Sequence, residues 1–188
     1  ILPADHHIQF SDQFQKVIQI GRRHALDGRL ISFGIVPETP ETGYGYILKG
    51  AAKGDAGNEV AAFVEKPDMK LAEEFHASPD HFFNSGMSMF KASSLLAEIA
   101  GQQEELDQWW RDRQHKDLIS GYSSLPRISI DYGVMENADN IAMVEAEFDW
   151  DDLGSWEALH RMGAKDDNGC VKSGDVLVRD CSDSLLFS

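Results

Sequence analysis

The sequence predicts an α/β fold built on a mixed β-sheet. Short apolar runs that are typical of buried strands alternate with segments whose apolar residues recur at helical spacing. Pro, Gly, Asn and Ser separate these runs, and strands that alternate with helices and hairpins are the pattern of α/β proteins. The chain has 188 residues, of which 42% are hydrophobic, so it is long enough to enclose a sizeable core.

The first half of the chain contains two predicted helices with strands between them. Ser11 or Asp12 can cap the first helix, and Asp68 can cap the second, because their side-chain oxygens accept from free backbone N–H groups. The small polar stretch 50–58 predicts a hairpin tip between two of the strands. Three strands are predicted, at Leu30–Val36, Tyr46–Leu48 and Val60–Val64.

The second half of the chain begins with predicted turn chemistry and continues with strands and helices. From Gly169 onwards, strand-like pieces broken by Gly, Asp and Ser predict the start of a separate β element. The other predicted elements are an Asn84-Ser85-Gly86 turn with a short strand to Phe90, a helix from Ser93, strands at Arg127–Gly133 and Ile141–Val144, and a helix from Trp156.

The charge balance restricts the partners of the protein. Seventeen Lys and Arg residues against thirty-two Asp and Glu residues give a net charge of −15. This balance argues against nucleic acid or an anionic membrane as a partner, and no apolar run is long enough to span a bilayer. An anionic substrate would need a local concentration of Lys, Arg, backbone N–H groups or metal.

The cysteines and the first residues indicate the compartment and the extent of the chain. Cys170 and Cys181 are too few for a zinc site or a disulfide framework, so we expect reduced thiols and a cytoplasmic protein. No basic-then-apolar leader is present. The stretch 1–5 resembles a strand end running into a loop and lacks a starting Met, so we expect the chain to be a piece of something longer.

An acidic stretch at 148–156, Phe-Asp-Trp-Asp-Asp-Leu-Gly-Ser-Trp, follows the buried strand at Ile141–Val144. Three carboxylates within four residues repel one another, and the cost of desolvating them is tolerable only if a cation, a donor or water faces them. The stretch therefore predicts either a cation site or a solvated acidic turn between a strand and a helix.

Other polar groups lie where strands end, which is where ligands collect in an open α/β sheet. The Glu65 carboxylate can accept from vicinal hydroxyls and the Lys66 ammonium can meet a phosphate, although a surface ion pair is the simpler interpretation. Gly45 can offer its backbone to a ligand or simply make a turn. Asn84 is a turn residue first and a hydroxyl-binding amide second. His6 and His7 lack a third ligand nearby in sequence, which favours an ordinary loop role.

Six blocks in this order resemble the mannose-1-phosphate guanylyltransferases, a family of nucleotide-sugar pyrophosphorylases. The resemblance runs through nearly the whole chain, and the ordered set is far more specific than any one block. The blocks are Leu2–His6, Phe33–Ile35 with Pro40–Ile47, Phe63–Pro67, Asn84–Met87, Ser129–Glu136 and Trp150–Trp156.

The resemblance implies a Rossmann-like nucleotide-diphospho-sugar transferase fold with a mixed, mainly parallel sheet. Residues 1–163 would form the nucleotidyltransferase domain, with its N-terminal part missing. Residues 164–188 would be a linker and the first strands of a left-handed β-helix, because 174–177 and 183–186 are similar to the first turn of that segment in the family.

The resemblance also implies a reaction: mannose 1-phosphate attacks the α-phosphorus of GTP and gives GDP-mannose and pyrophosphate. Such a transfer needs in-line positioning and charge neutralisation. The positions that match the family's motifs have implied roles in this reaction. These are Asp5 and Asp152 as Mg²⁺ ligands, Glu65 for sugar hydroxyls, Lys66 beside the sugar phosphate, Gly45 and Asn84 toward the hexose, and Asp131 as a further sugar-pocket candidate.

The sequence departs from the family in one respect. The glycine-rich loop with Arg and Lys that wraps the triphosphate is absent, so we expect this chain alone to be inactive and the choice of guanine to stay open. Two alternatives follow: a noncatalytic sugar-phosphate-binding module, or a pyrophosphorylase for another sugar or nucleotide. A homodimer and a following isomerase domain also stay open.

Overall fold

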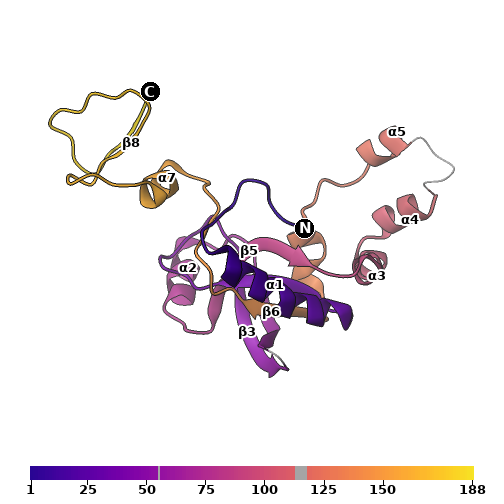
Figure 1. Cartoon of the computed structure of the whole chain (residues 1–188). Coiled ribbons are helices and arrows are strands. Elements are labelled where there is room, and N and C mark those ends of the chain that lie inside the picture. The colour runs from indigo at the N-terminus through magenta and orange to yellow at the C-terminus, as the bar shows by residue number, and fades with distance from the viewer. Residues whose placement is uncertain (55, 113–117) are drawn as a thin grey trace. The chain divides into compact units, whose positions relative to one another are not determined.

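The structure is a computed structural model that describes residues 1–54, 56–112 and 118–188 (Figure 1). These residues form two compact units. The first, which we call the sheet unit, comprises Ile1–Pro3 and Ser11–Phe148, and the second, the tail unit, comprises Ala4–Phe10 and Asp149–Ser188. Within the described ranges, no helix combines the length and the apolar character that a membrane crossing requires.

The sheet unit contains five strands and a series of helices. The strands are β2 (Leu30–Ile35), β3 (Tyr46–Lys53), β4 (Gly57–Val64), β5 (His81–Met89) and β6 (Ile141–Glu145). The helices are α1 (Ser11–Leu26), α2 (Met69–His76), α3 (Ala92–Gln102), α4 (Glu104–Asp112), α5 (Leu118–Ser123), α6 (Ile130–Gly133) and the 3₁₀ turn η2 (Met135–Asn137).

The five strands pair in the order β2-β5-β3-β4-β6, and β6 pairs in turn with β2, so the sheet closes on itself. The β2–β6 pair is parallel, whereas β2–β5, β5–β3, β3–β4 and β4–β6 are antiparallel. The prediction of an α/β fold with a mixed sheet is therefore confirmed. The prediction that the sheet is mainly parallel is wrong for the described strands, because β3 and β4 form a hairpin and parallel neighbours need longer crossovers.

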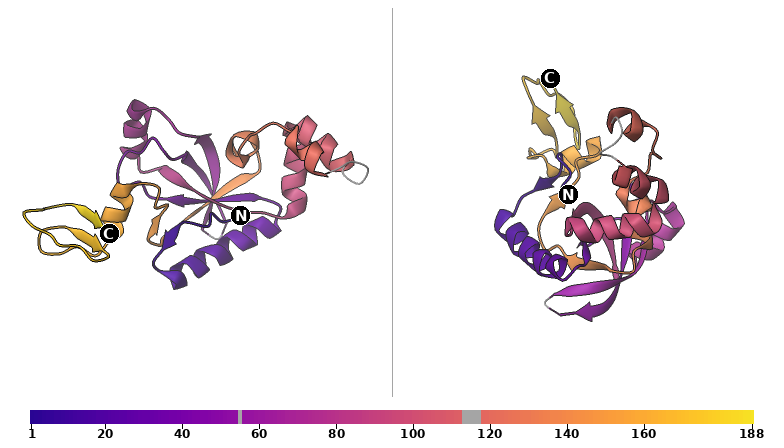
Figure 2. Two further views of the ribbon diagram at one scale, coloured as in Figure 1. Left: turned by 90° about the horizontal axis from the view of Figure 1, so that it is seen from above. Right: turned by 90° about the vertical axis from the view of Figure 1, so that its right-hand side faces the viewer.

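The core lies between the sheet and the helices that cover it. Leu30, Ile31 and Phe33 of β2 are fully buried, as an apolar run with no alternation predicts. Helix α1, indigo in Figure 2, lies along this strand. The helix and the strand approach so closely that a side chain at Gly21 of α1 would collide with the ring of Phe33.

Several predicted elements are confirmed with small changes in their bounds. Helix α1 begins at Ser11, and the Asp68 side chain caps α2 by accepting from the Leu71 N–H at 2.9 Å. Strands β3 and β4 extend further into the predicted hairpin tip at 50–58 than expected. Asp55, inside that predicted tip, lies outside the described residues.

Two predicted elements are wrong, and each has a local physical reason. The Asn84-Ser85-Gly86 turn lies inside β5, where the register shifts and Gly86 has a φ of 70°. A β-bulge in this part of the strand accommodates the left-handed backbone of Gly86, the residue that the sequence predicts in a turn. The predicted strand at Arg127–Gly133 ends in helix α6, because Ser129 caps it by accepting from the Tyr132 N–H.

The tail unit consists of two small sheets and one helix. Its elements are β1 (His7–Ile8), β7 (Trp150–Asp151), α7 (Trp156–Met162), β8 (Val171–Ser173) and β9 (Leu185–Phe187). β1 pairs antiparallel with β7, so residues at opposite ends of the sequence lie side by side. β8 pairs parallel with β9, with Val171 opposite Leu185. Strands β8 and β9 agree with the β element predicted from Gly169 onwards, whereas 174–177, one of the two stretches that resemble the family's β-helix turn, contain no strand.

Candidate functional site

The sheet unit brings together four of the residues that the sequence nominates, although they are far apart along the chain. Gly45 precedes β3, Glu65 follows β4, Asn84 lies in β5 and Asp131 lies on α6. The Asn84 N–H donates to the Gly45 carbonyl at 2.7 Å, and the Asn84 side-chain amide donates to Asp131 Oδ1 at 3.0 Å. A side chain at Gly45 would collide with Glu65 Oε2. These four residues therefore form one cluster.

The Glu65 carboxylate is the least satisfied group of this cluster. Its side chain is 10% exposed, and among the described residues its buried Oε2 has no hydrogen-bond partner. Burial raises the pKa of Glu65, and the nearby charges of Asp131 and Glu136 raise it further, whereas Lys66 lowers it. A buried acceptor without a donor is costly in a folded protein, and a ligand hydroxyl would supply the missing donor.

Lys66 joins the cluster through an ion pair and an unusual backbone. Its Nζ lies 3.3 Å from Glu65 Oε1, and its side chain remains half exposed. Its φ is +48°, in the left-handed region, although the next residue is Pro67 and residues before proline favour extended backbone. Such a conformation costs on the order of 1–3 kcal/mol and is found preferentially at functional sites.

The Asn84 side chain is already occupied by the protein, which sequence reasoning did not predict. Its Oδ1 accepts from the Ser32 hydroxyl at 2.9 Å and from the Gly86 N–H at 3.2 Å, while its Nδ2 holds Asp131. Asn84 therefore organises the cluster and leaves one amide hydrogen for a ligand. Ser32 is fully buried in β2. It was not predicted as a partner of Asn84 because it lies within an apolar run of the sequence.

Glu136 is a second residue that sequence reasoning missed. Its Oε1 accepts from the Glu65 N–H at 3.1 Å, so it touches the residue that carries the free acceptor. The signal available in the sequence was its place at the end of the block Ser129–Glu136. Nothing in that block alone distinguishes a buried contact from a solvated carboxylate.

The tail unit contains the two predicted metal ligands. β1 and β7 pair His7 with Asp151, and one further step of that register places His6 opposite Asp152. The charges of Asp5 and Asp152 both raise the pKa of His6, against a larger lowering by burial, so both carboxylates lie near this imidazole. Sequence positions 5 and 152 are thus brought into one neighbourhood.

The turn after β7 fixes the direction of the acidic stretch. Asp151 is 3% exposed, and it accepts from Arg161 Nε at 3.1 Å and from the Leu153 N–H at 2.8 Å. Leu153 has a φ of +52°, and the Gly154 N–H donates to Asp152 Oδ1 at 3.1 Å. Asp151 is therefore a structural anchor, whereas Asp152 is partly exposed, so a cation in solvent can reach its carboxylate.

The chemistry of these donors fits magnesium and does not fit a fully protein-held metal. Within the described ranges, no group of three or more His, Cys, Asp or Glu side chains could hold an ion. Mg²⁺ is usually held by one or two carboxylates together with water and substrate phosphates. Asp5 and Asp152 would supply two hard oxygen ligands of that kind.

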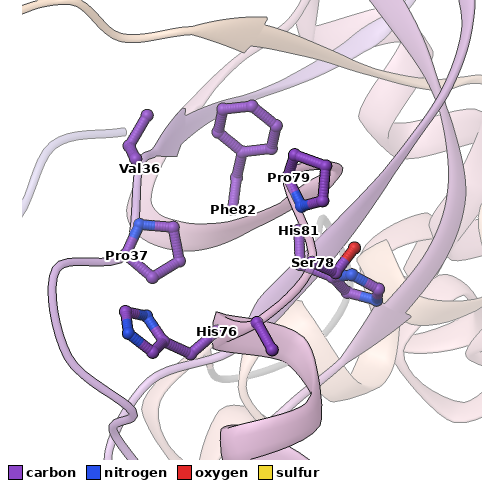
Figure 3. Close-up of a pocket in the computed structure, with 8 residues that line it drawn as sticks. Val36, Pro37, His76, Ser78, Pro79, His81 and Phe82 are labelled. Atoms are coloured by element: carbon purple, nitrogen blue, oxygen red, sulfur yellow. The ribbon is translucent and has the colours of Figure 1, made fainter.

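A separate cavity of about 250 Å³ opens at the C-terminal end of β2. Figure 3 shows the rings of Pro37, His76, Pro79 and Phe82 around it. None of the residues nominated by the sequence is among the described residues that line it. The cavity is therefore not part of the candidate site.

Comparisons with known proteins agree with the motif resemblance. Residues 1–169 match the family model described as nucleotidyl transferase. Curated mannose-1-phosphate guanylyltransferases from Klebsiella pneumoniae and Escherichia coli are each 38% identical over 200 residues, which cover all of this chain and 42% of each relative. The chain therefore spans less than half the length of these relatives.

A solved structure shares the fold. The crystal structure of a protein from Thermus thermophilus, described as a mannose-1-phosphate geranyltransferase, matches with a TM-score of 0.84 and 29% identity. The match covers the whole of this chain and 58% of that chain. Together with the family match, this likeness confirms the predicted Rossmann-like α/β fold with a mixed sheet.

Proposed function

The chain belongs to the nucleotidyl transferase family, and on this premise we propose that the protein is a mannose-1-phosphate guanylyltransferase. In the proposed reaction a phosphate oxygen of mannose 1-phosphate attacks the α-phosphorus of GTP. The bond from this phosphorus to the β-phosphate oxygen breaks, and pyrophosphate leaves with the bonding electron pair. The products are GDP-mannose and pyrophosphate.

The observation that supports this proposal most strongly is the unpaired, buried Oε2 of Glu65 beside the bare backbone of Gly45. A hexose presents several hydroxyl donors, and a carboxylate can accept from two neighbouring ones. The absence of a side chain at Gly45 leaves room for Oε2, because a Cβ at that position would collide with it. Glu65 therefore accepts from sugar hydroxyls, and Gly45 lets the sugar approach the backbone.

The remaining residues of the cluster act on the orientation of the sugar phosphate. Lys66 meets the phosphate, since its ammonium is half exposed and next to the hydroxyl acceptor. Asp131 contributes an additional acceptor, and Asn84 holds it in place through the 3.0 Å hydrogen bond. These residues provide positioning and charge neutralisation, which a phosphoryl transfer requires more than covalent help.

In the same proposal, Asp5 and Asp152 would hold Mg²⁺, which would neutralise charge on the triphosphate. The anchored Asp151 keeps the turn of Asp152 in place. Arg161 pairs with Asp151 and balances its negative charge within the protein.

Further parts of the proposal concern organisation and surroundings. Residues 1–163 are the nucleotidyltransferase domain and 164–188 lead into a left-handed β-helix, which the parallel pairing of β8 with β9 supports. GTP and mannose 1-phosphate are the partners, with a homodimer left open. The cytoplasm is the compartment, and the free thiols of Cys170 and Cys181 are compatible with it.

Pyrophosphate release by the full-length protein from GTP plus mannose 1-phosphate tests the proposal. We expect release that depends on Mg²⁺ and on both substrates, because the transfer needs an attacking sugar phosphate, a nucleoside triphosphate and neutralisation of the triphosphate charge. A panel of other nucleoside triphosphates and hexose 1-phosphates serves as the comparison. A clear preference for another pair would overturn the assigned substrates, and no release with any pair would overturn the reaction.

A further inference from the structure

We propose that Glu136 is a positioning residue for the sugar-phosphate site, because its carboxylate fixes the backbone of Glu65. This inference rests on the proposed function for its kinetic consequences. Its structural content is independent of that function. It concerns one hydrogen bond, from the Glu65 N–H to Glu136 Oε1 at 3.1 Å.

The contact is built from an anchored element. Glu136 lies on η2, where the neighbouring Met135 is 1% exposed and packs with Leu30 and Val134 in a buried cluster. The η2 backbone is therefore held by the core, and the Glu136 side chain reaches from it to the end of β4. A fixed acceptor at that place restrains the Glu65 backbone at the point where the chain enters the left-handed conformation of Lys66.

The short segment 131–136 contacts two residues of the site. Asp131 on α6 accepts from the Asn84 amide, and Glu136 accepts from the Glu65 N–H. Residues 131–136 therefore connect Asn84 inside β5 with Glu65, which follows β4. A shift of this segment would displace two ligand-facing groups together. A change at Glu136 would therefore affect sugar binding as well as the local structure around Glu136.

The charge of Glu136 argues against a purely structural role. The ionised groups that face Glu65 are Asp131, Glu136 and Lys66, two acids and one base. A neutral acceptor would hold the Glu65 N–H without adding a second like charge beside a buried carboxylate. Like charges in a pocket raise the pKa of the buried group, and such arrangements are concentrated at functional sites.

Two substitutions separate the hydrogen bond from the charge. Glu136→Ala removes both, whereas Glu136→Gln keeps an acceptor oxygen and removes the charge. Glu73→Ala is the matched control, because it deletes an exposed carboxylate on α2, an element that contains none of the residues of the sugar cluster. All variants are made in the full-length protein and compared by kcat, KM for mannose 1-phosphate and pH dependence.

Glu136→Ala is expected to raise KM for mannose 1-phosphate about tenfold with a smaller change in kcat, since sugar contacts are made equally in ground and transition states. Glu136→Gln should restore KM to within about threefold, since it retains the acceptor. It should also move the acid limb of kcat/KM to lower pH, because Glu65 loses a neighbouring negative charge. Wild-type KM in the Ala variant, or Gln as impaired as Ala, would overturn the inference.

A second measurement keeps this test separate from that of the proposed function. Hydrogen exchange of the Glu65 amide, followed by NMR, should become faster in Glu136→Ala and stay near wild type in Glu136→Gln and Glu73→Ala. If wild-type protein turns over no hexose phosphate, the proposed function fails while this exchange pattern still supports the contact. Unchanged exchange in Glu136→Ala contradicts the positioning role whatever the activity.

Discussion

At the scale of one residue, Glu65 is a carboxylate in an environment that is unfavourable to its negative charge. Its side chain is nearly buried beside two other acids, and one oxygen lacks a partner among the described residues. Burial and like charge both favour the protonated form, so the pKa of Glu65 is raised. The single favourable neighbour is Lys66, whose half-exposed ammonium is partly screened by water. Ionised Glu65 therefore costs stability that a hydroxyl-bearing ligand could recover.

Glu65→Gln is expected to stabilise the protein while it impairs activity. Because the folded pKa of Glu65 is raised, its contribution to stability is present at low pH and lost as pH rises through that pKa. Gln avoids this loss, so the melting temperature at pH 7 should rise and the difference from wild type should vanish in acid. kcat/KM should fall about 10- to 150-fold, matching the ~1.5–3 kcal/mol of hydrogen bonds to charged groups. A destabilised variant at pH 7 would contradict the burial argument.

Gly45 and Gly43 provide a matched pair of substitutions in one loop. A side chain at Gly45 would collide with Glu65 Oε2, whereas no atom of the described residues lies within 4 Å of a Cβ built at Gly43. Gly45→Ala should therefore displace the carboxylate and raise KM for mannose 1-phosphate at least about tenfold, a cost of ~1.4 kcal/mol or more. Gly43→Ala should change KM less than about twofold. Steady-state kinetics of the two variants decide this, and equal effects would exclude a specific contact at Gly45.

At the scale of elements, the β7–α7 turn places two adjacent aspartates in different environments. Asp151 is buried and accepts from Arg161 and the Leu153 N–H, whereas Asp152 is partly exposed. The sequence Trp-Asp-Asp-Leu gives no indication of which of the two faces inward. That difference comes from pairing with β1, a strand of two residues whose short sequence carries no periodic signal.

Asp151→Asn and Asp152→Asn are predicted to have opposite consequences. Asp151→Asn should lower the free energy of unfolding by about 2 kcal/mol, because a charged hydrogen-bond acceptor for Arg161 is lost. Asp152→Asn should leave unfolding nearly unchanged and lower turnover about 100-fold or more, with more Mg²⁺ required. Urea unfolding monitored by tryptophan fluorescence and Mg²⁺ titrations of turnover measure the two effects. If Asp152→Asn retained wild-type turnover, the metal assignment would be wrong.

Strand β5 shows why some elements could not be predicted from sequence. Asn84-Ser85-Gly86 has the composition of a turn, and its local chemistry does occur, since Asn84 Oδ1 accepts from the Gly86 N–H. The neighbouring strands keep the chain extended on both sides, so this chemistry appears as a bulge in β5. Buried runs such as Leu30–Ile35 were predictable because a nearly continuous apolar run indicates a strand that is buried on both faces. Pairing direction and bulges depend on partners distant in sequence.

At the scale of the whole molecule, the residues nominated from sequence divide between the two units. Gly45, Glu65, Asn84 and Asp131 lie in the sheet unit, whereas Asp5 and Asp152 lie in the tail unit. The motif resemblance nominated these residues, because each block carries recognisable chemistry. It could not predict Ser32 or Glu136, since a serine in an apolar run and one acid among many gain meaning only from their tertiary contacts.

This division predicts that sugar-phosphate binding does not require metal. The hydroxyl acceptors and the Lys66 ammonium belong to the sheet unit, so mannose 1-phosphate should bind in EDTA and stabilise the protein by about 2.7 kcal/mol at a hundredfold excess over Kd. Thermal melting with and without the ligand measures this stabilisation. Asp152→Asn should retain it, since we propose that its carboxylate serves the metal, and Glu65→Gln should lose most of it. Stabilisation that disappears in EDTA would show that the metal helps to bind the sugar phosphate, and the separation of roles between the units would be wrong.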